Sequence, residues 1–252
     1  MRREGRWILD GIDWTIHAGE RWAIIGPNGS GKTTLLRVAS TYLWPSRGRV
    51  EVLGETIGRT DARELRRRIG YVSAALSAEV DPALAAVDVV MTARHAALAP
   101  WWAGYSAADR ARAVDGLARL GLAGFEARPF GSLSSGESSR VLIARTLMTE
   151  PDLVLLDEPA AGLDLGARED LLSRLTTMTA GSVLAIALVT HHLEEIPAGF
   201  DRALVLAEGS VRASGPIDAV LTDATLSGAY GLPLEVDVRA GRFSARSGTR
   251  RG

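Results

Sequence analysis

Short apolar stretches alternate with longer amphipathic segments along most of this chain. Four apolar stretches have the length and composition of buried strands: Arg21–Ile25, Ile69–Val72, 153–156 and 183–189. Helical periodicity or helix boundary signals mark the segments 31–41, 61–68, 136–148 and 165–178. This alternation of strands and helices predicts an α/β fold with a mostly parallel sheet.

Further strands are predicted outside these four stretches. Alternating apolar and polar residues at 12–16 predict a half-buried strand, and 50–53 predicts another. The apolar segments 203–206 and 211–213 flank Glu208-Gly209-Ser210, which predicts a hairpin and an antiparallel portion of the sheet. The last dozen residues are rich in arginine, glycine and serine, which predicts a solvated tail.

The middle of the chain has little β pattern and is predicted to be a helical insertion. Helices are expected at 87–97 and 106–120, with Ser106 and Asp109 spaced as a capping box. Pro100-Trp101-Trp102 lies between them and fits either a packed corner or an aromatic patch that receives a partner. We therefore divide the single domain 1–252 into an α/β core at 1–75 and 131–222, a helical subdomain at 76–130, and a C-terminal extension and tail at 223–252.

Composition narrows the possible functions. The 252 residues contain no cysteine, which excludes disulfides, thiolate metal sites and cysteine nucleophiles. A net charge of −1 gives no bulk electrostatic reason to expect nucleic acid as a partner. No apolar run approaches the ~18 residues of a spanning helix, and the N-terminus lacks an apolar signal region. We therefore expect a cytoplasmic protein that would reach a membrane only through a partner.

A phosphate-binding motif follows the strand predicted at Arg21–Ile25. The stretch fits G-x-x-x-x-G-K-[ST] and comprises Gly26, Pro27, Asn28, Gly29, Ser30, Gly31, Lys32 and Thr33, with Thr34 next in the helix. Glycines allow backbone amides to surround an anion, and the helix N-terminus adds positive potential. Lys32 is the only lysine among 29 basic residues, so a compact ammonium is used at this position alone. The alternative, a glycine-rich turn without function, explains neither the lysine nor the strand–loop–helix context.

Two carboxylates end the apolar run at 153–156. In phosphate-loop folds an aspartate at the end of such a strand binds Mg²⁺, which Asp157 would do together with the Thr33 hydroxyl. The next residue, Glu158, is placed to accept a proton from an attacking water. The alternative is a strand that simply ends in two surface acids.

Three further segments complete a family pattern. Leu133-Ser134-Ser135-Gly136-Glu137 opens a predicted helix with Ser134 or Ser135 as its N-cap, and is similar to the signature LSGGQ. Ala161-Gly162-Leu163-Asp164 resembles the D-loop, and Thr190-His191 resembles the switch histidine, although His191-His192 with Glu194-Glu195 would also fit a metal site. With the phosphate loop and Asp157-Glu158 in this order, the chain resembles the ATP-binding subunit of ATP-binding cassette (ABC) transporters from about 11 to 221.

The resemblance implies a phosphate-loop NTPase fold, an ATPase activity and the cofactors ATP and Mg²⁺. It implies a head-to-tail pair of cassettes, with the phosphate loop of one facing Ser134, Ser135, Gly136 and Asp164 of the other. Glu158 and His191 would be catalytic, and transmembrane permease subunits would anchor the pair at the inner face of the cell membrane. A cytosolic cassette serving DNA repair or ribosomes is the alternative, but such proteins usually carry coiled coils, zinc modules or duplicated cassettes.

Two positions depart from the family pattern. Ala74 stands where a glutamine is expected, so coupling to Mg²⁺ would use Ser73 or a water instead. The aromatic residue that stacks on adenine would fall near Arg3, so either translation begins further upstream or Arg3 or Trp7 holds the base instead. The segment 228–233 resembles the tails of importer subunits for metal chelates, so the resemblance is importer-like.

Overall fold

The computed structural model describes residues 1–3, 5–99, 104–179 and 181–248, so Pro100-Trp101-Trp102 lies outside the described residues. A six-stranded sheet forms the centre of the fold. Its strands, in spatial order, are β10 (Ser210–Pro216), β9 (Arg202–Ala207), β3 (Arg21–Ile25), β8 (Ala185–Val189), β7 (Leu153–Asp157) and β6 (Ile69–Val72). Within this sheet, β9 and β10 pair in antiparallel orientation, and each of the other neighbouring strand pairs is parallel. The predicted fold class, an α/β sheet that is mostly parallel with an antiparallel portion, is confirmed.

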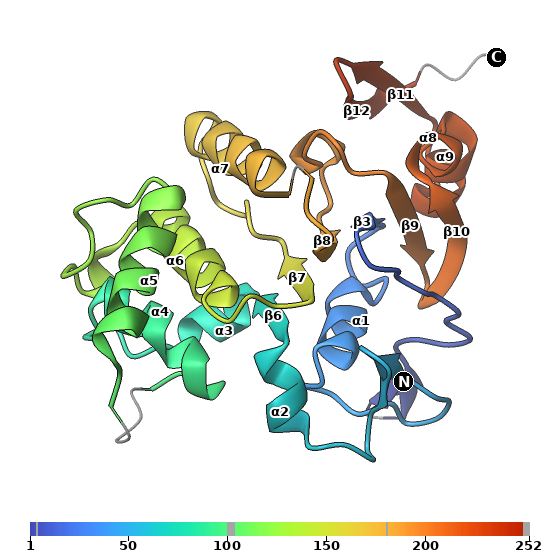
Figure 1. Ribbon diagram of the computed structural model, residues 1–252. Helices are drawn as coiled ribbons and strands as arrows, with labels where there is room; N and C mark the ends of the chain where they lie inside the picture. Colours follow the sequence, from blue (N-terminus) through green and yellow to red (C-terminus); the bar gives the residue numbers. More distant parts are fainter. Residues whose placement is uncertain (4, 100–103, 180, 249–252) are drawn as a thin grey trace.

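Both faces of the sheet are buried along β9, β3, β8, β7 and β6, which explains why these strands are mostly apolar rather than alternating, whereas the edge strand β10 is partly exposed. In β3, Ala23 and Ile25 join one apolar core while Trp22 and Ile24 join the other. Figure 1 shows the helices around the sheet. They are α1 (Lys32–Ala39), α2 (Ala62–Arg67), α3 (Ala74–Ala78), α4 (Ala86–Met91), α5 (Ala107–Arg119), α6 (Ser135–Leu147), α7 (Leu165–Thr179), α8 (Ile217–Val220) and α9 (Asp223–Tyr230). Of these, α4 and α5 lie beyond α6.

The predicted helical insertion forms a layer of short helices. Helices α4 and α5 pack against α6 on one side of the molecule (Figure 1). The predicted capping box is present, because Ser106 caps α5 and Asp109 bonds back to the Ser106 backbone. The helix expected at 87–97 is shorter than predicted, since α4 changes into a 3₁₀ turn, η1 (Thr92–His95). Treating 76–130 as a subdomain remains a prediction.

The strand predicted at 12–16 is wrong. Side-chain exposure alternates along this segment as expected, but its backbone forms no ladder with any described strand. Period-two patterning fixes which side chains face inward, whereas a strand also needs a neighbour to pair with. Two-stranded hairpins lie nearby instead, β1 (Arg2–Arg3) with β2 (Arg6–Trp7) and β4 (Glu51–Val52) with β5 (Glu55–Thr56).

Two other boundaries need correction. The apolar run at 183–189 enters the sheet only at Ala185, and Val183 is 82% exposed. The C-terminal residues do not form a solvated tail as far as Gly248: β11 (Leu234–Arg239) pairs with β12 (Arg242–Ser247). Phe243 and Ala245 alternate with polar residues in β12 and pack against the core, so the segment has a buried face. No described helix is both long and apolar enough to cross a membrane.

Candidate active site

Three neighbouring strands end at the same level of the sheet. Val189, the last residue of β8, pairs with Ile24 in β3 on one side and with Asp157 in β7 on the other. The phosphate loop follows β3, Asp157-Glu158 lies at the end of β7, and Thr190-His191 follows β8. Ligands of open α/β sheets bind outside the carboxyl ends of the strands, and the topology brings these three predicted segments to that edge.

The phosphate loop depends on glycine where the backbone is most crowded. Gly26 has φ 154°, and a Cβ there would lie 2.0 Å from the carbonyl oxygen of Leu206. Gly31, with φ 102°, is the N-cap of α1, so the loop delivers its amides to a helix N-terminus. The Ser30 hydroxyl is buried and has no hydrogen-bond partner in the described part of the chain. An unsatisfied buried hydroxyl in an amide-rich loop fits a site for an anion.

The Lys32 ammonium lies over this loop. It is 5% exposed and donates to the carbonyl oxygens of Gly26 at 2.7 Å and Pro27 at 3.0 Å. Burial lowers the pKa of Lys32, and the charges of Glu158 and Asp157 oppose that shift. The ammonium is therefore held between loop carbonyls and carboxylates, where it can neutralise phosphate charge.

Asp157 and Thr33 bring two oxygen ligands together. The Thr33 hydroxyl donates to Asp157 Oδ1 at 3.1 Å, and Asp157 is 6% exposed. The pKa of Asp157 is raised to about 6, chiefly by burial and also by the charge of Glu158, while the Thr33 hydrogen bond and the charge of Lys32 oppose this rise. A buried carboxylate beside a hydroxyl is a hard oxygen donor set of the kind Mg²⁺ prefers. These residues fit the metal that the sequence predicts.

Glu158 and His191 face each other across the edge of the sheet. Glu158 Oε1 lies 3.2 Å from His191 Nδ1, and the two side chains are 33% and 35% exposed. Glu158 has φ 51°, a left-handed conformation that is costly for a non-glycine residue, and its N–H donates to Val189 O at 2.9 Å. The strand thus turns sharply after Asp157, and both side chains remain accessible to a ligand.

A buried pair that the sequence analysis missed supports His191. Thr190 is fully buried, and its hydroxyl donates to the buried carboxylate of Glu195. The Thr190 hydroxyl also accepts from the His192 N–H at 3.0 Å. The apolar run before Thr190 draws attention to the strand, whereas an acid five residues later gives no recognisable pattern of its own.

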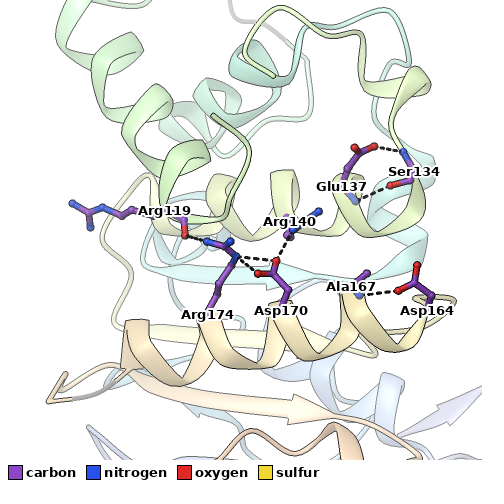
Figure 2. Close-up of polar contacts among 8 residues, drawn as sticks. All are labelled: Arg119, Ser134, Glu137, Arg140, Asp164, Ala167, Asp170 and Arg174. Carbon is purple, nitrogen blue, oxygen red and sulfur yellow. Dashed lines mark hydrogen bonds and ion pairs between the residues drawn. The ribbon is translucent and has the colours of Figure 1, made fainter. Parts of the chain in front are cut away.

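The signature segment caps an exposed helix N-terminus. Ser134, rather than Ser135, is the N-cap of α6: its backbone N–H donates to Glu137 at 2.7 Å and its hydroxyl accepts from the Glu137 N–H at 3.3 Å (Figure 2). Ser134 and Ser135 are exposed, whereas Gly136 is buried, and a Cβ on it would lie 3.0 Å from Leu163. Glycine therefore lets the helix start close to the D-loop segment.

Asp164 begins the neighbouring helix in the same way. Its carboxylate accepts from the Ala167 N–H at 2.8 Å at the start of α7 (Figure 2). The same figure shows Asp170 on α7 bound by Arg140 of α6, at 2.6 Å, and by Arg174, which also donates to the carbonyl of Arg119 in α5. These ion pairs tie α6 and α7 together, so the signature segment and Asp164 form one exposed surface.

The predicted site residues thus fall into two groups. Residues from the phosphate loop, β7 and β8 converge at the sheet edge, whereas 134–136 and Asp164 gather elsewhere. Among the described residues, no hydrogen bond or ion pair joins either of these signature-side segments to the phosphate loop. Helix α6 does contact the segment that follows β7, because the Ser139 hydroxyl donates at 2.7 Å to the carbonyl oxygen of Pro159, the residue after Glu158.

Ala74 is the first residue of α3, which the sequence analysis did not predict. Ser73 caps this helix by accepting the Leu76 N–H at 3.1 Å, and Ala74 itself is exposed. Within the described part of the chain, no group of three or more histidine or acidic side chains is placed to hold a metal ion. The alternative metal site at 191–195 therefore finds no support, since its members bond to Glu158 and Thr190 instead.

The fold and this edge of the sheet define a nucleotide-binding ATPase, and comparison with known proteins gives the same class. The family model for ABC transporters matches residues 9–161. The chain is 41% identical to the ABC transporter ATP-binding protein YlmA of Bacillus subtilis, covering 94% of this chain and 90% of YlmA. It is 40% identical to the hemin import ATP-binding protein HmuV of Streptomyces coelicolor, covering 92% and 81%.

Solved structures agree. A dimeric ATP-binding cassette with bound ADP and Pi has a TM-score of 0.75 at 26% identity, covering 86% of this chain and 94% of that one. A metal-chelate type ABC transporter in an inward-facing conformation has a TM-score of 0.76 at 26% identity, covering 95% and 90%. The chain belongs to the ABC transporter family and is an ATP-binding, ATP-hydrolysing subunit of such a transporter. The alternative of a non-transport cassette is not favoured.

Proposed function

We propose that two cassettes face each other head to tail and that each ATP is held by the phosphate loop of one and the signature segment of the other. The observation that carries this proposal is the separation of the predicted site residues into a sheet-edge group and an exposed helix N-terminus. The α6 N-terminus at Ser134–Gly136 would present its amides to the γ-phosphate of a nucleotide bound on the partner.

On the sheet-edge side, amides of the loop 26–31 surround the phosphates, and Lys32 neutralises their charge. Thr33 and Asp157 would hold Mg²⁺, which supplies charge neutralisation between phosphate oxygens when bound. The raised pKa of Asp157 supports this assignment, because a buried carboxylate lacking a fully compensating charge favours a cation beside it.

The Glu158 carboxylate accepts a proton from a water molecule as the water oxygen attacks the γ-phosphorus. The bond to the β–γ bridging oxygen breaks, and ADP leaves with the bonding electrons. His191 contacts the γ-phosphate and, at 3.2 Å from Glu158, also keeps that carboxylate directed at the reacting centre. Catalysis then comes mainly from positioning and charge stabilisation, for which closure of the two cassettes is needed.

Between the two adenine-stacking candidates, the structure favours Trp7. The carbonyl of Ile8, the next residue, lies against Gly31 at the end of the phosphate loop, where a Cβ on Gly31 would approach it to 2.9 Å. Trp7 is 43% exposed, and the Arg47 guanidinium lies 5.7 Å from its ring centroid. An exposed indole beside the loop offers a stacking face for the base.

We further propose that this ATPase drives an import system by binding transmembrane permease subunits at the inner face of the membrane. Related ATPases named for hemin and cobalt import, at 40% and 37% identity, support the import direction. Opening and closing of the cassette pair would move the permease through the helical layer around α3, α4 and α5.

Affinity purification from the native membrane tests the permease partner. The tagged chain, isolated in mild detergent, should retain a membrane-spanning protein in stoichiometric amount, and ATP hydrolysis by the complex in vesicles should respond to transported substrate. A Lys32→Ala chain, tagged in the same way, controls for nucleotide-independent capture. Recovery with ribosomes or DNA, and without any spanning protein, would contradict the transport assignment.

A further inference from the structure

The β11–β12 hairpin near the C-terminus contacts two segments that adjoin the active site. Arg242, at the start of β12, donates to Glu169 on α7 through both Nη atoms, at 2.8 and 3.2 Å. The same guanidinium donates to the carbonyl oxygen of Glu194 in η3 (Leu193–Glu195), at 2.5 Å. One side chain of the hairpin therefore joins three elements that are far apart in sequence.

Both partners of Arg242 lie a few residues after a proposed site residue. Helix α7 begins directly after Asp164, and Glu169 is in its second turn. The η3 turn begins two residues after His191. A movement of η3 or of the start of α7 is therefore transmitted to the switch histidine or to the D-loop segment through only a few bonds.

The segment 190–195 is held by contacts on two sides. On the inside, the buried carboxylate of Glu195 accepts from the Thr190 hydroxyl. On the outside, Arg242 binds the Glu194 carbonyl. Between these two fixed points, His191 is only one-third exposed and bonds to Glu158. With Arg242 removed, the inner contact remains, but the Glu194 carbonyl loses the one charged side chain that donates to it among the described residues.

The Arg242–Glu169 pair has the geometry of a bidentate contact. Two N–H groups of the fork meet the two carboxylate oxygens, and this hydrogen bonding lowers the pKa of Glu169. Both side chains are partly exposed, at 31% and 44%, so we expect little net stability from the pair. The planar guanidinium fork favours a geometric role over an energetic one.

We propose that Arg242 is a positioning residue for ATP hydrolysis, which fixes the switch segment 190–195 against α7 and thereby sets the His191–Glu158 geometry. This inference rests on the proposed catalytic role of His191. It makes the C-terminal hairpin a part of the catalytic apparatus rather than an appendage, and it gives any molecule that displaces the hairpin a means of slowing the ATPase.

The test compares Arg242→Ala with Arg246→Ala in the full-length chain. Arg246 is the matched control, because it lies on the same strand and its one ion-pair partner among the described residues is Glu235 inside the hairpin, at 3.1 Å. We expect Arg242→Ala to lower kcat for ATP hydrolysis about tenfold, since small displacements of catalytic groups are costly, with little change in KM. Arg246→Ala should keep kcat, and the two variants should unfold at similar temperatures.

Two additional variants separate geometry from folding. Glu169→Gln removes the ion pair but leaves the contact with the Glu194 carbonyl, so its loss of kcat should be smaller. Arg242→Lys keeps the charge but not the fork, and it should fall between the wild type and Arg242→Ala. Equal kcat values for Arg242→Ala and Arg246→Ala would overturn the proposal, as would a loss that follows unfolding temperature across all four variants.

Combining Arg242→Ala with His191→Ala tests whether the arginine acts through the histidine. If it does, Arg242→Ala has no further effect once the imidazole is absent, whereas independent effects multiply. Multiplying effects would overturn the positioning role. If His191→Ala alone leaves kcat unchanged, the catalytic role of His191 fails; if only Arg242→Ala leaves it unchanged, that role stands and the present inference fails.

Discussion

The phosphate-loop side and the signature side of this molecule differ in the burial of their polar side chains and in the direction of their pKa shifts. Lys32, at the start of α1, and Asp157, at the end of β7, are nearly fully buried, and their pKa values are shifted in the direction that disfavours charge. On the signature side, Ser134, Ser135 and Asp164 are exposed; Ser134 and Asp164 cap helices, and the Ser135 hydroxyl donates to the Gly162 carbonyl at 3.4 Å. There the pKa of Glu137 is lowered, chiefly by the Ser134 backbone N–H.

This difference in burial and pKa fits a different binding step on each side. A buried, electrostatically costly arrangement is suited to a ligand that brings compensating charge, as a nucleotide with its metal does. An exposed helix N-terminus that is already capped costs the monomer nothing and becomes useful only when another surface brings an anion to it. Under the proposed head-to-tail pairing, these are two half-sites that meet only between two chains.

Lys32→Ala should have the largest effect, because it removes the cation from the buried half-site. We expect ATP hydrolysis to fall by about 100-fold or more, with weaker nucleotide binding and an unchanged fold. Lys32→Arg keeps the charge but replaces a compact ammonium with a planar fork, so most of the activity should also be lost. Fluorescent-nucleotide titration and phosphate release measure the two steps, and hydrolysis at the normal rate would remove Lys32 from the site.

Glu158→Gln should separate binding from chemistry. The amide preserves size and hydrogen bonding but cannot take a proton, so hydrolysis should slow by about 100-fold or more while MgATP still binds. Trapped ATP should then hold two chains together, and sizing chromatography should detect a dimer with MgATP but not with MgADP. A variant that stays monomeric in excess MgATP would contradict pairing between copies of this chain.

Opposite responses to pH should distinguish the two sides in the nucleotide-free protein. Because the pKa of Asp157 is raised to about 6, its contribution to stability is present at low pH and is lost as pH rises through about 6. Asp157→Asn should therefore stabilise the chain at pH 8, by up to about 3 kcal/mol, and progressively less towards pH 4.

Glu137→Gln is the matched change on the signature side. Its lowered pKa contributes stability above the ordinary glutamate pKa, and that contribution is lost as pH falls through the folded value. The substitution should destabilise the chain at pH 8 and have little effect in strong acid. Denaturant unfolding at several pH values measures both changes, and parallel pH profiles for the two variants would contradict the contrast.

Ala74→Gln should have the smallest effect. If the position adjoins the metal, an added amide should tighten apparent Mg²⁺ affinity or raise the rate by about threefold, because Mg²⁺ readily keeps waters in place of protein ligands. A lower rate would mean that the segment is built around a small side chain, as the exposed start of α3 suggests. No change in either quantity would show that Ala74 does not approach the metal.

The sequence predicted the buried half-site better than its surroundings. Apolar runs, glycines and a lone lysine mark the phosphate loop and Asp157-Glu158 directly, because burial and backbone geometry restrict which residues can occupy them. The strand predicted at 12–16 is wrong, because alternation predicts which side chains face inward but does not identify a pairing strand. The β12 strand is hard to predict because its alternation, Phe243 and Ala245, is short and lies among arginines that are typical of a solvated tail.

Contacts between distant segments were the least predictable feature. Thr190 with Glu195, Asp170 with Arg140 and Arg242 with Glu169 join residues whose spacing has no motif. Each depends on how helices and turns pack after the sheet has formed, which a single sequence does not encode as a local pattern. The family resemblance supplied the roles of Ser134–Gly136 and His191, which spacing alone would not have assigned.

Mixing two inactive variants tests the two-half-site account most directly. Lys32→Ala damages the buried half-site, and Ser135→Asp places an acid where the partner's γ-phosphate would lie, although an acid at a helix N-terminus does not harm the helix itself. Each variant alone should be inactive. In an equal mixture, half of the dimers combine one chain of each kind, and one of their two composite sites is intact, so about a quarter of the wild-type ATPase rate should return. A mixture that stays as inactive as its components would contradict the account, because it would mean that each site is completed within one chain.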